Sequence, residues 1–128
     1  MRGPGGRRIE ARVAGGATLG RFEVRDGFLG RMRGLLGTGR SATPILIARC
    51  RSIHCMGMRY AIDVAFLDVG GRVLLARRGL VPGSLLGCRF AAGVLERPEG
   101  PGPWPCDGDL VELSELPGEI APARAKGV

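Results

Sequence analysis

The chain has 128 residues, of which 45% are hydrophobic and 24% charged, and its formal net charge is +7. A chain of this length is expected to fold as one domain with its own hydrophobic core. No apolar stretch approaches the roughly 20 residues that cross a bilayer as a helix, and residues 1–12 are too polar for an export signal. These features predict a cytoplasmic protein without a membrane span.

The positive charge is concentrated in the first half of the chain. Residues 1–60 hold 12 Arg and 3 acidic residues, whereas residues 61–128 hold 7 basic and 9 acidic residues. A basic half is typical of proteins with an anionic partner, or of an ordinary solvated face. Because the arginines alternate with apolar residues, the solvated face is favoured. Nucleic-acid binding through this arginine-rich half remains an alternative, although the chain shows no recognised nucleic-acid-binding motif.

The first part of the chain is predicted to hold two strands and a helix. Apolar and polar residues alternate over residues 7–13, and more weakly over 19–24, as in half-buried strands. Over residues 27–36 the apolar period becomes helical, with Asp26 as a plausible N-cap and Gly37 as a stop. The apolar face of this helix comprises Phe28, Leu29, Met32, Leu35 and Leu36.

The rest of the chain is predicted to consist of strands. The predicted strands are residues 44–48, 60–67, 73–76, 90–95 and 110–113. Gly70-Gly71 supplies a hairpin turn between two of them. About six strands and one principal α-helix predict a mainly β fold, all-β or α+β. The expected form is a small antiparallel β-barrel or sandwich with the helix on one side. We expect a single β-rich domain over residues 1–116 and a mobile tail over 117–128.

A buried carboxylate is predicted within the strand at residues 60–67. Alternate side chains of a strand share a face, so Asp63 lies among small and apolar neighbours, with Arg59 on the same face. An unpaired buried charge is very costly, so Asp63 must have a partner. Arg59 is the nearest candidate, and Arg31 or Arg33 of the predicted helix is another.

Two interpretations of this charge follow. In the favoured one, Asp63 pins the helix or a loop through an ion pair. In the other, His54, Arg59 and Asp63, with Arg31 and Arg33, form a polar pocket that binds an anion or a peptide terminus. Acid–base catalysis by His54 and Asp63 is a minor third interpretation.

The thiols near the only histidine give a weaker alternative. Cys50, His54 and Cys55 are three soft-metal ligands within six residues. However, adjacent residues of a strand point to opposite faces, so only a turn would bring His54 and Cys55 together. A small metal- or thiol-dependent hydrolase that uses His54 with Cys50 or Cys55 is therefore the rival to a non-enzymatic binding module. We favour the binding module and expect no metal and no cofactor. The expected partner is a protein or an anionic ligand.

Trp104, the only tryptophan, lies between Pro103 and Pro105 in a loop rich in glycine and proline. A tryptophan held in this way either caps the core or is exposed as an anchor for a partner. The sequence leaves both alternatives open.

Several motifs together resemble a known family. They are Arg31–Gly37, Cys50–His54, Met58–Asp68, Val94–Glu96 and Gly108–Asp109. Over roughly residues 20–113 the chain resembles the bacterial and archaeal domain of unknown function 192 family. The resemblance implies a compact, mainly β domain with residues 31–37 in its helix, and no known reaction. Some members are encoded near tight-adherence (Flp-type) pilus genes, so an accessory role in pilus assembly is an expectation.

Overall fold

The computed structural model describes residues 7–25, 43–54 and 59–117, which form nine strands. The strands are β1 Arg8–Val13, β2 Thr18–Arg25, β3 Ile45–Ala48, β4 Ser52–His54, β5 Ile62–Leu67, β6 Val73–Leu80, β7 Leu85–Gly87, β8 Gly93–Pro98 and β9 Val111–Glu115. Seven of them form one sheet in the order β6-β5-β8-β3-β2-β1-β9. Strands β4 and β7 pair with each other as a separate two-stranded ribbon. All neighbours are antiparallel except β2 and β3.

The mainly β fold predicted from the sequence is confirmed, and every predicted strand is present, with shifted ends. The sequence missed β4 and β7, because three residues are too short to show alternation. The predicted helix over residues 27–36 lies outside the described residues. The same is true of residues 118–128 of the predicted tail. The described part of the chain contains no helix, and therefore none that could cross a membrane.

The large sheet curls until its two edge strands meet at one end. Arg72, beside β6, forms a β-bridge with Leu110, beside β9. The Val111 amide donates to the Gly71 carbonyl at 2.8 Å. Gly71 has a φ of +94°, and a Cβ there would collide with the Val111 carbonyl oxygen, so only glycine fits. The predicted barrel is therefore a curled sheet whose edges join near this turn.

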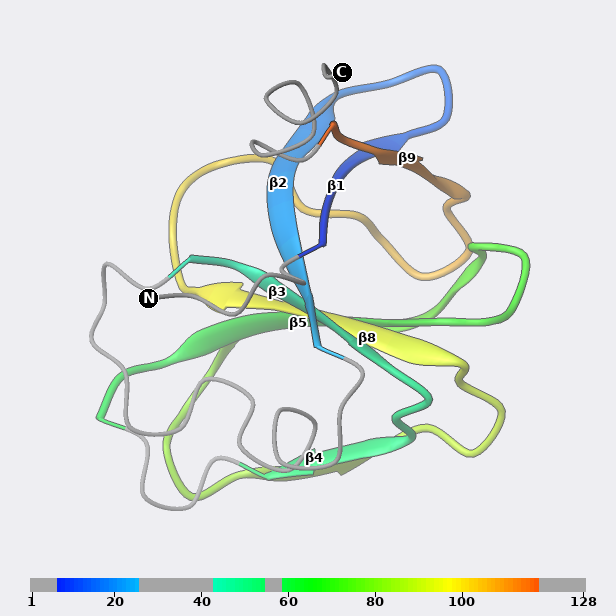
Figure 1. The fold of residues 1–128 in the computed structure, drawn as a ribbon. Coiled ribbons are helices and arrows are strands. Elements are labelled where there is room, and N and C mark those ends of the chain that lie inside the picture. The colour runs from blue at the N-terminus through cyan, green and yellow to red at the C-terminus, as the bar shows by residue number, and fades with distance from the viewer. Residues whose placement is uncertain (1–6, 26–42, 55–58, 118–128) are drawn as a thin grey trace.

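The strands at the centre of the sheet are buried on both faces, so β5 is buried along its whole length. One face packs against the ribbon, and the other faces the inside of the curl. Figure 1 shows β4 on one side of β3, β5 and β8, with β1, β2 and β9 on the other. The ribbon-side core comprises Ile45, Ile47, Ile53, Tyr60, Ile62, Val64, Phe66, Ala91 and Val94. The inner core comprises Ile9, Ala11, Leu19, Phe22, Ala65, Leu67, Val73, Leu95, Trp104 and Val111.

Candidate functional site

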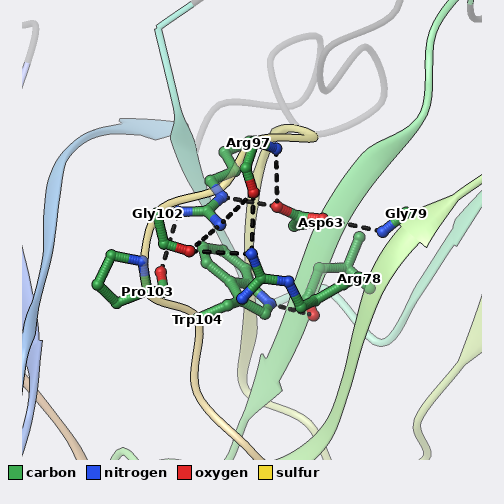
Figure 2. Close-up of polar contacts among 9 residues, drawn as sticks. Asp63, Arg78, Gly79, Arg97, Gly102, Pro103 and Trp104 are labelled. Atoms are coloured by element: carbon green, nitrogen blue, oxygen red, sulfur yellow. Dashed lines mark hydrogen bonds and ion pairs between the residues drawn. The ribbon is translucent and has the colours of Figure 1, made fainter.

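Asp63 is a fully buried carboxylate (0% exposed) with three donors. It lies directly opposite Arg97 in the pairing of β5 with β8. The Arg97 Nε donates to its Oδ2 at 2.7 Å, and the Gly79 amide donates to its Oδ1 at 2.9 Å (Figure 2). The Gly100 amide makes a longer contact of 3.4 Å to Oδ2. A charge-assisted bond and two amides supply the partners that a buried charge requires.

A bulge in β6 brings the Gly79 amide to this carboxylate. The register of β6 against β5 shifts between Ile62 and Val64, so β6 carries an extra residue there. Gly79 has a φ of +68°, and a Cβ at this residue would lie 2.9 Å from the Glu99 Oε2. Glycine is therefore favoured by the backbone conformation, whereas the end of the flexible Glu99 side chain could move aside.

Arg97 fastens the loop that follows β8. Its guanidinium donates to the Pro103 carbonyl at 3.0 Å and the Gly102 carbonyl at 2.9 Å. It also lies 4.4 Å from the Trp104 ring centroid, a favourable cation–π contact. Arg78 donates to the Gly102 carbonyl as well, at 3.0 Å (Figure 2). Asp63 and Arg97 thus hold a loop across one end of the inner core, as the favoured interpretation of Asp63 proposed.

Trp104 lies in the inner core and is only 8% exposed. Its indole N–H donates to the Val64 carbonyl at 2.9 Å, and its ring contacts Phe22 with the centroids 6.3 Å apart. The prediction that Trp104 is an exposed anchor for a partner was therefore wrong. The cation–π contact and the indole hydrogen bond draw the ring inward, so it caps the core.

The structure does not bring the predicted pocket residues together in the part of the chain that it describes. Asp63 is bound by Arg97 rather than by Arg59, which precedes β5 and is exposed. The predicted ion pair between Asp63 and Arg59 was wrong. Arg97 faces Asp63 directly from the neighbouring strand, so it lies closer to the carboxylate than Arg59 does. His54 pairs with Leu85 across the ribbon, although its side chain is not described. Arg31 and Arg33 lie outside the described residues.

The described thiols form no disulfide with one another. Cys50 and Cys88 pack half-buried against the ribbon-side core, and Cys106 is exposed. The Cys50 Sγ lies 3.1 Å from the Ser52 carbonyl oxygen, to which it donates. Among the described residues, no three His, Cys, Asp or Glu side chains are grouped to hold a metal ion. Cys55 lies outside these residues, so the Cys50–His54–Cys55 set is not assembled in what can be seen.

Glu96 is a second buried carboxyl, which sequence reasoning did not single out. It lies on β8 directly between Ile45 of β3 and Val64 of β5, and is 4% exposed. No hydrogen bond to its carboxyl group is found among the described residues. Burial raises the pKa of Glu96 to about 7, and the nearby Arg25 guanidinium partly opposes this shift. Glu96 therefore holds a proton near neutral pH. The alternation of Val94 with Glu96 could have revealed it, because Val94 is an obvious core residue.

A basic surface lies where the chain enters β4 and leaves β7. The Cys88 amide donates to the Arg51 carbonyl at 2.7 Å, and the Arg49 amide donates to the Ala92 carbonyl at 2.7 Å. These bonds place residues 49–51 beside residues 88–92. We call the resulting patch the arginine surface; it comprises Arg49, Arg51, Arg89 and Phe90. All four residues are exposed, Phe90 at 79%.

No acidic residue balances the charge in the segments that build the arginine surface. Residues 43–54 and 81–95 contain neither Asp nor Glu. The face formed by β1, β2 and β9 is different, because arginines and acids stand opposite each other there. The opposed pairs are Arg8 with Glu23, Glu10 with Arg21, and Arg12 with Glu112. Residues 49–51 and 88–92, at the ribbon end of the molecule, therefore carry positive charge in segments without an acid.

No family model and no curated protein matches the chain. Two solved structures share its fold. One is a putative transcription regulator from Sinorhizobium meliloti 1021, with a TM-score of 0.67 and 22% identity over 84% of this chain and 93% of that chain. The other is a protein of unknown function from Novosphingobium aromaticivorans DSM 12444, with a TM-score of 0.59 and 18% identity over 82% and 83% of the two chains. At these identities the similarity establishes the fold alone.

Proposed function

We propose that this protein is a non-enzymatic binding module that takes an anionic partner on the arginine surface. The observation that carries the proposal is the pair of exposed arginines, Arg51 and Arg89, in segments without any acid. Clustered positive charge attracts anions and speeds their association. The exposed apolar side chain of Phe90 adds contact area beside that charge.

The charges of Arg51 and Arg89 are available to a partner. Many other described arginines are engaged in ion pairs within the molecule. These pairs are Arg7 with Glu115, Arg25 with Glu23, Arg77 with Asp107, and Arg97 with Asp63. Within the described part of the chain, Arg51 and Arg89 have no ion pair. An incoming anion would therefore meet guanidinium groups that have no acidic competitor.

The resemblance to the domain of unknown function 192 family agrees with a binding module but names no partner. An accessory role in tight-adherence pilus assembly stays a prediction; it would require a pilus component with an acidic surface. The rival hydrolase with His54 and Cys50 or Cys55 also stays a prediction. The half-buried Cys50 thiol donates to the Ser52 backbone carbonyl, and a thiol nucleophile would also need an adjacent base.

The test is a polyanion-binding titration with a matched control. A fluorescein-labelled heparin oligosaccharide is titrated with the wild type, with Arg51→Ala/Arg89→Ala, and with Arg12→Ala/Arg21→Ala. The two double variants lose equal charge from exposed side chains. We expect the first to bind about tenfold more weakly, which corresponds to about 1.4 kcal/mol, and the control to stay close to wild type. Equal weakening in both variants would show that the overall net charge binds the probe, and would reject the site.

A further inference from the structure

Phe90 is unusual among the aromatic residues that the structure describes. Phe22, Tyr60, Phe66 and Trp104 are buried in the two cores, whereas Phe90 is 79% exposed. Its ring therefore contributes little to the packing of the cores. An exposed aromatic ring beside positive charge is a common element of sites that bind unpaired nucleotides.

The ring and the charges are held close together by a turn. The Ala91 amide donates to the Cys88 carbonyl at 3.2 Å, so Arg89 and Phe90 occupy the middle of that turn. The Arg89 guanidinium lies 5.7 Å from the Phe90 ring centroid. Arg51 lies on the neighbouring segment, where its backbone carbonyl accepts a hydrogen bond from the Cys88 amide. An exposed aromatic ring and a guanidinium thus lie together on one turn, with the Arg51 backbone on the segment beside it.

This arrangement selects among the anions that the proposed function allows. An acidic peptide would pair with the arginines but offers no flat ring to stack on Phe90. Duplex DNA keeps its bases stacked on each other, so it offers no unpaired base face to the Phe90 ring. An unpaired nucleotide offers both groups at once, a phosphate for the guanidinium groups and a base face for the ring.

We infer that the arginine surface binds single-stranded nucleic acid, with phosphates on Arg51 and Arg89 and a base stacked on Phe90. This inference rests on the proposed function and names the partner of that same surface. It adds one requirement that a general polyanion site lacks, namely that the base itself contributes to affinity.

The test separates the base from the charge. A labelled oligothymidylate is compared with an abasic oligonucleotide of the same length and charge, using the wild type, Phe90→Ala and Phe90→Tyr. We expect the wild type to favour the oligothymidylate by about tenfold, Phe90→Ala to lose that preference, and Phe90→Tyr to keep it. Because Phe90 is exposed, all three proteins should melt at the same temperature.

Two outcomes would overturn the inference, and they differ in what they leave standing. If the wild type binds the heparin oligosaccharide through Arg51 and Arg89 but does not distinguish the two oligonucleotides, the surface is a general anion site and single-strand recognition is rejected. If the wild type binds neither heparin nor oligothymidylate, the proposed function fails together with the inference.

Discussion

At the scale of residues, Asp63 and Arg97 bind each other at the end of the inner core, and each also holds backbone groups of a different segment. Asp63 accepts from Gly79 in β6, whereas Arg97 donates to carbonyls of the loop after β8. A buried ion pair contributes little net free energy, but removing one partner leaves an uncompensated charge. The pair therefore specifies where the loop lies more than it adds to stability.

The first prediction concerns this pair. Arg97→Ala is expected to lower the free energy of unfolding by roughly 3–5 kcal/mol, because Asp63 would remain buried without its cation. Arg78→Ala is the matched control, since exposed Arg78 donates to the same Gly100 and Gly102 carbonyls and should cost only about 1 kcal/mol. Urea unfolding measures both. Similar small losses would show that Asp63 is not held by Arg97.

The second prediction concerns the titration of Glu96. Its pKa is about 7 when folded, against 4.5 for an unburied glutamate, so the folded state retains a proton that the unfolded state has lost between these values. The contribution of Glu96 to stability is therefore fully present below about pH 4.5 and is lost as the pH rises through about 7. The total loss is on the order of 3 kcal/mol. Glu96→Gln should remove this component and be more stable than wild type near pH 8. The prediction would be contradicted if raising the pH from about 5 to about 8 changed the urea midpoint by the same amount in the wild type and in Glu96→Gln.

At the scale of elements, closure of the sheet depends on one tight turn. Asp68 accepts from the Gly70 and Arg72 amides through Oδ1 at 2.9 and 2.8 Å, which fixes the turn between β5 and β6. This leaves Gly71 against the backbone of Val111. The turn therefore sets the point at which β9 meets the opposite edge of the sheet.

The third prediction tests this closure. Gly71→Ala should destabilise the protein by about 1–3 kcal/mol and lower the hydrogen-exchange protection of β9, because both its φ and its space exclude a side chain. Gly83→Ala is the matched control, since Gly83 also has a positive φ of +91° but no atom within 4 Å of an added Cβ. If the two variants lose equal stability, the contact with Val111 has no role in closing the sheet.

Local patterns predicted the strands, through alternation of apolar and polar residues in Arg8–Val13 and through a largely apolar run in Ile62–Leu67. The same alternation correctly placed Asp63 on a buried face, because the period of a strand is a local property. The partner of Asp63 was missed because Arg97 lies on another strand, and no local pattern records which strands pair. The short strands β4 and β7 were missed for a related reason, so the arginine surface that they support could not be seen in the sequence.

At the scale of the whole molecule, the fold separates its charges. The curled sheet opposes arginines with acids on β1, β2 and β9, whereas the ribbon lies at the other end of the molecule with an acid-free arginine surface (Figure 1). The sequence shows that charge is unevenly distributed along the chain, but it does not show where the positive charge lies in the folded molecule. Arginines of the first two strands stand opposite acids in the sheet, whereas the segments that carry Arg51 and Arg89 contain no acid.

The most direct measurement is an NMR titration of nitrogen-15-labelled protein with the heparin oligosaccharide and with the oligothymidylate. The predicted result is that amide signals move mainly at residues 49–52 and 87–91, with both ligands. Movement centred on residues 8–12 and 21–25, or an even shift over all exposed arginines, would contradict the proposal that this protein binds an anionic partner on its arginine surface.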